Sequence, residues 1–367
     1  MKKMIINGAN GYVASNFIVE LLQHNYQVVA LVRSNKKLSA RERMEQVLLE
    51  MNDGQQLPFE NLMVFDYSLF EENFALQPEQ LEAIFSEEAD YFHFAASLKF
   101  DIKSKEEIFS TNLQGVTNSV NTFKKYSPAA SRFFFVSTAY SCGQMNDVFE
   151  ERFYDDAEID SFRNYYEQSK RYAENMIRKF RDEEQLNAHI LRLSQIVGNN
   201  QNGVTKTDYG IFDFSKRIQN IALKYPDSTV RLRINPESTQ NLLPIDILVN
   251  YLMDAVRAEE LPVILNMVAK QSVRNADIMN SLGKLLPIKL IPEFNIQHSE
   301  MTLLERIIDA GMAFTGAYID INLKFDTTKL DGILNAQPSK ICAESIHQML
   351  DYFLNEQATK KYKKAMS

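Results

Sequence analysis

Two side chains with the types and spacing for proton transfer, Tyr166 and Lys170, lie in the stretch "NYYEQSKRYAE" (residues 164–174). Residues four apart in a helix lie on one face, so these side chains are expected to be neighbours. A phenol with a pKa of about 10 is a poor acid–base catalyst at neutral pH. An ammonium group ~4 Å away, at an effective dielectric constant of ~20, favours the phenolate by about 4 kcal/mol, or about three pKa units. The pair therefore suits proton transfer, but this spacing is common by accident, and other residues must decide its role.

A hydroxyl group that could act with this pair follows an apolar run. The run Arg132–Ser137 ("RFFFVS") predicts a strand, and "VSTAYSCG" places Thr138 at its carboxyl end. In open α/β sheets, ligands bind at the carboxyl ends of the strands. We therefore expect Thr138 to lie at the ligand-binding edge, where its hydroxyl could hold a substrate carbonyl oxygen against Tyr166.

The N-terminal stretch "NGANGYVASNF" predicts a dinucleotide site, because it follows a predicted strand and begins a helix. Gly8 permits a tight turn, Gly11 lets the backbone approach a pyrophosphate, and Ala14 is small enough for helix–strand packing. Backbone N–H groups at the helix start then face the phosphates, aided by the helix dipole. The residues predicted to contact the cofactor here are Gly8, Asn10, Gly11, Tyr12 and Val13.

The end of the second predicted strand favours NADP(H) over NAD(H). Arg33 stands where an acidic residue would accept a hydrogen bond from the ribose 2′-hydroxyl of NAD. The basic residues that follow it are Lys36, Lys37, Arg41 and Arg43. A guanidinium group pairs well with a phosphate and has little to offer a neutral hydroxyl. We therefore predict NADP(H), with Arg33 first and Arg43 second at the 2′-phosphate; the alternative is a charged helix start at the surface.

Two later stretches fit the remainder of a dinucleotide. "VFDYS" places Asp66 after the third predicted strand, where its carboxylate could accept a hydrogen bond from the adenine amino group. "HFAAS" (residues 93–97) follows the fourth predicted strand, and its small residues allow the cofactor to approach the backbone. The residues predicted to contact the cofactor here are Ala95, Ala96 and Ser97. Each signal is weak alone, and their order along the chain gives them weight.

Short apolar runs recur along the chain, each followed by a segment with helical periodicity. They are Lys3–Asn7, Gln27–Val32, Leu62–Phe65, Tyr91–Phe94, Arg132–Ser137 and Ala188–Leu193, with Val263–Val268 as a seventh. The runs are continuous rather than alternating, as in strands that are covered on both faces of a parallel sheet. Strands that alternate with helices predict an α/β fold with a doubly wound parallel sheet of the Rossmann type.

The length of the chain predicts more than one core. Its 367 residues exceed the size at which a single hydrophobic core usually stops growing. The alternation of strand and helix loosens after residue 200. We therefore predict an NADP-binding domain over residues 1–200, to which residues 240–270 return, and a smaller, mainly substrate-binding lobe over residues 201–367.

Composition limits the classes of partner. The net charge of −8 argues against nucleic acid, because binding phosphates needs a basic surface. No apolar run reaches the length of a membrane span, and the run after Lys2 and Lys3 is too short for a signal peptide. Two cysteines and five scattered histidines form no metal-binding pattern. The sequence therefore predicts a cytoplasmic protein without a metal site.

In their order along the chain, six stretches resemble the motifs of the extended short-chain dehydrogenase/reductase family. They are "NGANGYVA", "HFAAS", "NLQGVTN", "VSTAYSCG", "YYEQSK" and "RLSQIVG", and the resemblance covers residues 3–270. It implies that Tyr166 is the general acid/base and that Lys170 binds the nicotinamide ribose and lowers the pKa of the tyrosine. It also implies that Thr138 is the third catalytic residue and that Asn112 is the supporting asparagine.

Within this family the chain is similar to the thioester reductase and fatty acyl-CoA reductase group, of the male-sterility type. The stretches that carry the similarity are "LVRSNKKLSARERMEQVL", "VSTAY", "NYYEQSKRYAE" and "FDTTKL" (residues 325–330). The similarity implies NADPH-dependent reduction of an acyl thioester, on coenzyme A or an acyl carrier protein, to an aldehyde or alcohol. It also implies a homodimer formed through helices within residues 105–125 and 164–180. "VFDYS" lacks the Gly-Asp that is usual at the third strand, and the C-terminal lobe matches only loosely.

Two other functions stay open on the sequence alone. One is a nucleotide-sugar epimerase, or a ketone or hydroxyl dehydrogenase, of the same family. Arg231 and Arg233 in "TVRLRI" could bind a diphosphate, although alternation along a strand more simply puts both on a solvated face. The other is a catalytically silent NADP-binding sensor, for which a degraded Tyr166–Lys170 pair would be expected.

Overall fold

A computed structural model describes residues 2–311, 318 and 320–366 of the chain. Contacts within it divide the chain into two compact units. Unit 1 comprises Met1–Leu193, Val249–Met267 and Phe325–Asn335, and unit 2 comprises Ser194–Leu248, Val268–Lys324 and Ala336–Ser367. Residues 325–335, which the sequence predicts to lie in the C-terminal lobe, pack within unit 1.

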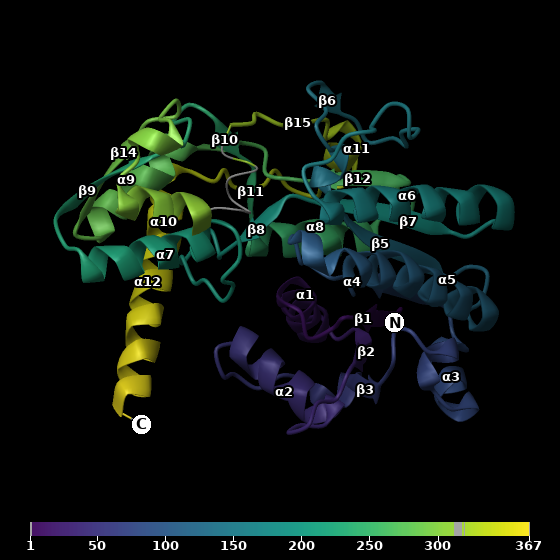
Figure 1. Cartoon of the computed structure of the whole chain (residues 1–367). Helices are drawn as coiled ribbons and strands as arrows, with labels where there is room; N and C mark the ends of the chain where they lie inside the picture. Colours follow the sequence, from purple (N-terminus) through teal and green to yellow (C-terminus); the bar gives the residue numbers. More distant parts are fainter. Residues whose placement is uncertain (1, 312–317, 319, 367) are drawn as a thin grey trace. The chain divides into compact units, whose positions relative to one another are not determined.

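Unit 1 is built on one sheet of seven strands (Figure 1). In spatial order the strands are β12 (Ile264–Met267), β7 (Ala188–Leu193), β5 (Arg132–Thr138), β4 (Ala89–His93), β1 (Lys3–Asn7), β2 (Gln27–Val32) and β3 (Leu62–Asp66). All neighbouring strands are parallel, which confirms the fold class predicted from the sequence. The strand order reverses between β1 and β4, and this switch point is where open α/β sheets bind ligands.

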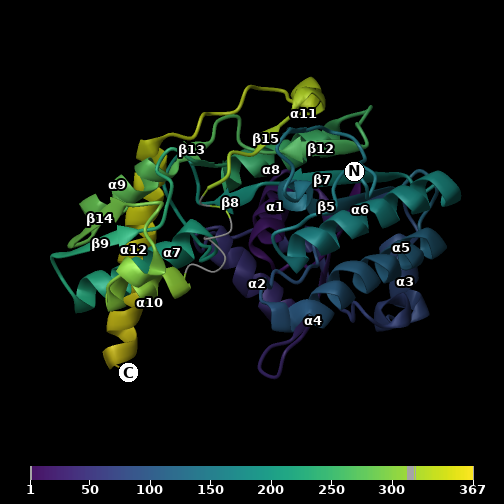
Figure 2. The same cartoon turned by 45° about the horizontal axis from the view of Figure 1, so that its top comes forward.

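Helices cover both faces of this sheet. Phe92 of β4 packs against Phe17 of α1 (Tyr12–Gln23), with ring centroids 5.1 Å apart. The preceding residue, Tyr91, points to the other face, and its ring lies 5.8 Å from that of Phe123 in α5 (Gly115–Tyr126). α2 (Ala40–Met51) packs beside α1, whereas α3 (Pro78–Phe85) and α6 (Tyr165–Glu184) share the core on the α5 side (Figure 2).

The remaining elements of unit 1 are short. α4 (Lys105–Phe109) continues through a π-helical turn, Ser110–Gln114, into α5. α8 (Ile245–Arg257) leads from unit 2 into the returning segment Val249–Met267, and α11 (Thr328–Ile333) lies in the later returning segment Phe325–Asn335. Where the chain re-enters unit 1, β15 (Lys324–Phe325) pairs with β6 (Val148–Phe149).

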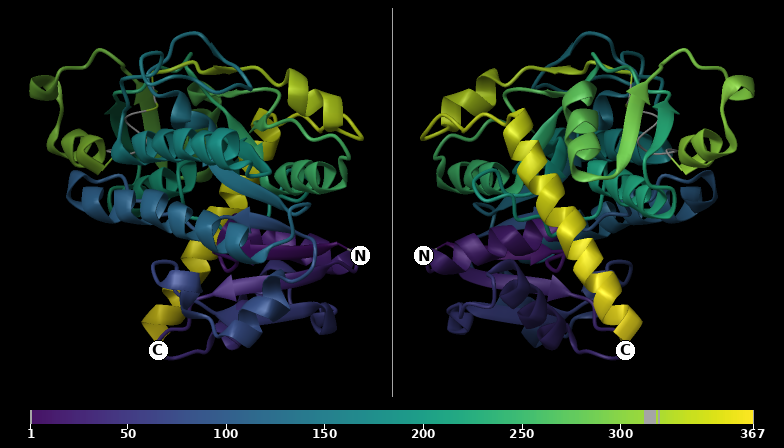
Figure 3. Two further views of the ribbon diagram at one scale, coloured as in Figure 1. Left: turned by 90° about the vertical axis from the view of Figure 1, so that its right-hand side faces the viewer. Right: turned by 90° about the vertical axis from the view of Figure 1, so that its left-hand side faces the viewer.

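In its described residues, unit 2 combines short strand pairs with α-helices. β9 (Ser228–Leu232) and β14 (Ile288–Pro292) are parallel, as are β8 (Gln195–Val197) and β11 (Leu242–Pro244), whereas β10 (Thr239–Gln240) and β13 (Val273–Arg274) are antiparallel. The helices are α7 (Ile211–Lys224), α9 (Asn275–Leu285), α10 (Leu303–Gly311) and α12 (Ala343–Met366). α12, the long yellow helix of Figure 3, packs against α7 and α9, and its Phe353 ring lies 5.2 Å from that of Phe212.

Two negative observations hold for the part of the chain that the structure describes. None of its helices is both long enough and apolar enough to cross a membrane. Among the same residues, no group of His, Cys, Asp and Glu side chains is placed to hold a metal ion.

Candidate active site

The turn between β1 and α1 lies at the switch point of the sheet. Gly8 has a φ of +61°, and a Cβ atom at this position would lie 2.8 Å from the backbone nitrogen of Ala95. The Gly8 turn and the "HFAAS" loop are therefore packed so closely that only glycine is tolerated. The backbone nitrogen of Gly11 donates to the carbonyl oxygen of Gly8 (3.0 Å), which closes the turn before α1 begins.

The start of α1 has the features of a phosphate-binding site. Its N-cap residue, Gly11, is extended (φ −75°, ψ 157°) and has no side chain to cover the first turn. That turn, Tyr12–Ser15, contains no acidic residue that would repel a phosphate. The other residues predicted to contact the cofactor, Asn10 and Val13, stand directly before Gly11 and after Tyr12. A helix start of this kind binds anions through its N–H groups and the helix dipole. The residues present therefore fit the pyrophosphate of a dinucleotide.

A buried amide joins β1 to β4 beside this turn. The side-chain oxygen of Asn7 accepts from the backbone nitrogen of Ala95 (3.0 Å). A backbone N–H can only donate, so this bond fixes the amide, and its nitrogen faces Nδ1 of His93 at 2.9 Å. The same Nδ1 also lies 3.1 Å from the hydroxyl of Ser119. Burial, with the nearby charge of Lys170, lowers the pKa of His93 to about 3, so its ring is neutral.

The residues predicted to select NADP(H) lie together beyond the ends of β2 and β3. Arg33 is exposed, and the guanidinium group of Arg43, on α2, donates to its carbonyl oxygen. Asp66, the last residue of β3, is also exposed and accepts from the backbone nitrogen of Ser34 (2.9 Å). The structure thus brings the three side chains to one edge of the sheet, and their contacts with a cofactor stay predictions.

The predicted catalytic hydroxyls come from two elements that meet at the carboxyl end of β5. α6 begins after Asn164, whose side chain accepts from the backbone nitrogen of Glu167 (2.9 Å). Tyr166 lies in the first turn of this helix, near enough to Thr138 for the threonine hydroxyl to favour its phenolate form. Thr138 is 4% exposed, and its hydroxyl also donates to the carbonyl oxygen of Leu193 (3.2 Å). The neighbouring strand and helix therefore fix the position of this hydroxyl.

Lys170 is bound to the backbone of β5. Its ammonium group donates to the carbonyl oxygen of Val136 (2.8 Å) and lies 4.8 Å from the centre of the Phe135 ring. Burial lowers the pKa of Lys170 to about 7, although the charge of Glu174 acts in the opposite direction. The ammonium is therefore only partly protonated at neutral pH.

The predicted fall in the pKa of Tyr166 is wrong for this structure. Burial raises the pKa of Tyr166 to about 12, although the hydrogen bond with Thr138 acts against this shift. Two facts explain the difference. The ammonium group of Lys170 is directed at the carbonyl oxygen of Val136, and its own charge is weakened by burial.

Asn112 ties the "HFAAS" loop to α6. It lies in the π-helical turn Ser110–Gln114, a type of turn that is frequent at functional sites, and it is 1% exposed. Its side-chain oxygen accepts from the backbone nitrogen of Ser97 (2.8 Å), and its nitrogen donates to the hydroxyl of Ser169 (2.9 Å). The hydroxyl of Ser97 is buried without a hydrogen-bond partner among the described residues, as expected of a group that awaits a ligand.

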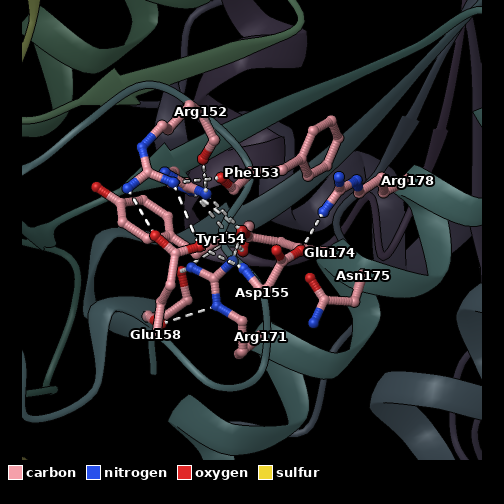
Figure 4. A network of polar contacts seen from close by, with 12 residues as sticks. Arg152, Phe153, Tyr154, Asp155, Glu158, Arg171, Glu174, Asn175 and Arg178 are labelled. Carbon is pink, nitrogen blue, oxygen red and sulfur yellow. Dashed lines mark hydrogen bonds and ion pairs between the residues drawn. The ribbon is translucent and has the colours of Figure 1, made fainter. Parts of the chain in front are cut away.

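A buried charged cluster adjoins these residues, and sequence reasoning missed it. Glu174 of α6 is fully buried and pairs with Arg171 on the same helix (3.0 Å) and with Arg192 on β7 (2.8 Å). The hydroxyls of Ser137 (2.5 Å) and Ser141 (2.8 Å) donate to the same carboxylate. Figure 4 shows Glu174 and Arg171 inside the wider polar network. Burial alone would raise the pKa of Glu174, but the two guanidinium groups outweigh it and lower the pKa to about 2.

One signal in the sequence could have revealed this cluster. Arg192 interrupts the apolar run Ala188–Leu193. A strand that is covered on both faces can carry a charge only if a buried partner neutralises it. An acidic residue on a helix packed against that strand was therefore to be expected.

Comparison with known protein families gives one match. The sequence model described as "Male sterility protein" matches residues 6–252, a range that includes the Gly8 turn, Thr138, Tyr166 and Lys170. This match confirms the family that the motifs predicted.

Two curated proteins are similar to parts of the chain. GRP2 of Candida albicans, named for NADPH-dependent methylglyoxal reduction, is 26% identical over 149 residues. Protein C162.02c of Schizosaccharomyces pombe is 27% identical over 195 residues. The matches span 40% and 53% of this chain, but only 40% and 18% of the two proteins.

Solved structures share the fold over nearly the whole chain. The terminal R domain from the myxalamid biosynthetic pathway has a TM-score of 0.76 at 16% identity, covering 98% of this chain and 92% of that one. An archaeal thiolation-reductase di-domain has a TM-score of 0.75 at 16% identity, covering 98% of this chain and 76% of that one. UDP-glucuronic acid 4-epimerase from Bacillus cereus, solved with NAD, has a TM-score of 0.65 at 14% identity, covering 96% of each chain. At these identities the likeness shows the fold alone.

Proposed function

The chain belongs to the male sterility protein family of NAD(P)-binding proteins, and from this premise we propose that it is an NADPH-dependent reductase of acyl thioesters. The thioester would be carried by coenzyme A or by a carrier protein, and the product would be an aldehyde or an alcohol. The observation that carries the proposal is that Thr138, at the carboxyl end of β5, meets Tyr166 and Lys170 of α6 at the sheet edge that also contains the Gly8 turn.

The residues present fit NADP(H), which supplies the hydride when bound. The start of α1 would hold the pyrophosphate, and Asp66 would accept from the adenine. Arg33 and Arg43, which lie side by side, would pair with the 2′-phosphate. The small residues of "HFAAS" leave room at the backbone, and the unpartnered hydroxyl of Ser97 offers a further polar contact.

Tyr166 would donate the proton that reduction consumes, although its raised pKa makes it a weaker acid than an ordinary phenol. With a pKa of about 12, its hydroxyl is fully protonated at neutral pH. As hydride reaches the carbonyl carbon, negative charge develops on the carbonyl oxygen, and the hydroxyls of Tyr166 and Thr138 would stabilise it. For a thioester, one hydride and one proton are consumed, the carbon–sulfur bond breaks, and an aldehyde, a free thiol and the oxidised dinucleotide result. Reduction of the aldehyde to the alcohol would consume a second hydride and proton.

The likeness to a UDP-glucuronic acid 4-epimerase supports a second candidate, a sugar epimerase or a ketone or hydroxyl dehydrogenase. The two arginines of "TVRLRI", however, are both engaged with α10. Arg231 pairs with Glu305 (2.8 Å) and Arg233 pairs with Asp309 (3.0 Å). This strand face is packed against a helix rather than simply solvated, and its arginines have carboxylate partners already, which argues against a role in binding a diphosphate.

The proposal is tested by the loss of NADPH absorbance with a panel of acyl thioesters, aldehydes, ketones and nucleotide sugars. We expect thioester-dependent oxidation of NADPH, and its disappearance in Tyr166→Phe while NADPH binding survives. Oxidation of NADPH with ketones or aldehydes alone would support the role of Tyr166 in proton transfer and refute the assignment of a thioester substrate. Binding of NADPH with no turnover on any compound, in the wild type, would favour the silent sensor.

Cofactor preference is tested separately by Arg33→Ala. We expect NADPH affinity to fall by about tenfold or more while NADH affinity changes little, because only the 2′-phosphate needs the guanidinium group. Arg41→Ala is the matched control, since Arg41 stands in the same basic stretch but pairs with Glu45 (2.6 Å). Equal losses of NADPH and NADH affinity in Arg33→Ala would refute the assignment to NADP(H).

A further inference from the structure

We propose that Glu174 is a positioning residue, which holds the carboxyl end of β5, and with it Thr138, in place against α6. The inference rests on the proposed function, because it takes Thr138 and Tyr166 to act in one reaction and Lys170 to bind the nicotinamide ribose, as the family resemblance implies. Glu174 itself does not line the reacting groups, since it is fully buried and its carboxylate is enclosed by Ser137, Ser141 and Arg192.

The two serine contacts of Glu174 lie on either side of Thr138. Ser137 is the residue before Thr138 in β5, and its hydroxyl donates to Oε1 of Glu174 (2.5 Å). Ser141 lies three residues after Thr138, in a short helical turn, and its hydroxyl donates to the same oxygen (2.8 Å). One carboxylate oxygen therefore holds the segment that carries Thr138 at both ends.

The same carboxylate is anchored on α6, the helix that carries Tyr166 and Lys170. Glu174 stands one helical turn after Lys170, so a shift of the β5 end against the helix would break both serine hydrogen bonds. Charge-assisted hydrogen bonds of this kind are shorter and stronger than neutral ones. The link thus sets the distance between Thr138, on the strand, and Tyr166, on the helix.

The cost of burying these charges supports a positioning role. Arg192 also donates to the carbonyl oxygens of Glu150 and Arg152 (both 2.9 Å), so each of its guanidinium nitrogens has a hydrogen-bond partner. Well-packed apolar side chains of similar volume often stabilise a core as well as, or better than, a buried ion cluster. Stability of the fold therefore does not explain why these charges are buried. The need to fix the position of the carboxyl end of β5 does explain it.

Glu174 also acts on Lys170 through its charge. Burial lowers the pKa of Lys170, and the carboxylate of Glu174 works against that shift. Among the described residues, His93 on β4 is the other titratable group in electrostatic contact with Lys170, and it is neutral above pH 5 because its pKa is about 3. Loss of the Glu174 charge would therefore lower the pKa of Lys170 further.

The test is Glu174→Gln, which keeps the size of the side chain and an oxygen that can accept from the serines but removes the charge. We expect kcat to fall about tenfold to a hundredfold, with the KM for NADPH unchanged within about twofold. The fall of kcat at alkaline pH, through the titration of Lys170, should move to lower pH than in the wild type. A residue with a merely structural role would not move this pH profile.

Asp90→Asn is the matched control. Asp90 is an equally buried carboxylate of unit 1, paired with Arg132 at the opposite end of β5 (2.8 Å). This variant should keep the wild-type kcat and pH profile. Equal losses of kcat in the two variants, or an unmoved pH profile in Glu174→Gln, would overturn the proposal.

Two outcomes need separate measurements. If Glu174→Gln does not fold, Ser137→Ala and Ser141→Ala serve instead, because each removes one hydrogen bond without removing a charge. Each should lower kcat, and a wild-type kcat in both would overturn the proposal.

If the wild type turns over no compound, the proposed function fails, and hydrogen exchange decides the positioning role. Faster amide exchange over residues 137–142 in Glu174→Gln than in Asp90→Asn would then support it, and equal exchange would refute it.

Discussion

The two ends of β5 each hold a buried ion cluster, and the clusters differ in what they contact. At the amino end, Asp90 accepts from two nitrogens of Arg132 (2.8 and 2.5 Å). At the carboxyl end, Glu174 pairs with Arg171 and Arg192 and accepts from two serine hydroxyls. Both carboxylates are fully buried, so depth alone does not distinguish them.

The neighbours of each cluster show its purpose. Arg132 also donates to the carbonyl oxygens of Val256 (2.8 Å) and Ala258 (3.2 Å), at the end of α8. The amino-end cluster thus fastens a helix to the sheet, at the edge where α/β sheets do not bind ligands. The carboxyl-end cluster contacts residues on both sides of Thr138. Similar ion pairs therefore serve packing at one end and the geometry of the proposed active site at the other.

The largest expected difference between the two ends of β5 is the loss of stability when each carboxylate is removed. Glu174→Ala leaves two fully buried guanidinium groups without this counter-ion, and we expect the free energy of unfolding to fall by about 3–5 kcal/mol. Asp90→Ala should cost less, about 2 kcal/mol, because it leaves only one guanidinium group, that of Arg132, which is 9% exposed, and the partly exposed Lys2 without this counter-ion. Urea unfolding followed by circular dichroism measures both. Equal losses in the free energy of unfolding would contradict the prediction that the guanidinium groups at the carboxyl end depend more on their carboxylate than the one at the amino end.

Replacing the serine beside each cluster should give a smaller difference in the free energy of unfolding between the two ends. Ser137 donates to the carboxylate of Glu174, and we expect Ser137→Ala to cost about 1.5–3 kcal/mol, as for hydrogen bonds to charged groups. Ser131, at the amino end, accepts from the backbone nitrogen of Ala89 (3.1 Å), and Ser131→Ala should cost about 0.5–1.5 kcal/mol. The same unfolding measurement applies. A larger loss in Ser131→Ala would reverse the expected ranking of the two ends.

The sheet and the glycine turn could be predicted because their signals are local. Each strand is a continuous apolar run, and Gly8 stands where such a run becomes a helical pattern. The positive φ of Gly8 and its closeness to Ala95 follow from that position at the switch point. A residue and its immediate neighbours in the chain were sufficient for these parts of the fold.

The cluster around Glu174 could not be predicted in this way, because its members come from four separate elements. In "SKRYAE" the charges resemble the solvated face of an amphipathic helix, yet Arg171 and Glu174 are fully buried. The direction of the pKa shift of Tyr166 escaped prediction for a related reason. Helical spacing places Lys170 on the correct face, but the target of its ammonium group, the carbonyl oxygen of Val136, is set by packing against β5.

The smallest effect is expected from an exposed ion pair one turn further along α6. Arg178 pairs with Asp155 (2.8 Å), but the two side chains are 41% and 73% exposed, and Figure 4 shows the pair at the margin of the network. Exposed pairs of this kind contribute less than about 1 kcal/mol and are screened by salt. Asp155→Asn should therefore change the unfolding midpoint little in low salt, not at all in 1 M salt, and leave kcat unchanged. A loss as large as that of Ser137→Ala would mean that burial does not set the strength of contacts along α6, and the contrast between the two ends of β5 would then need another cause.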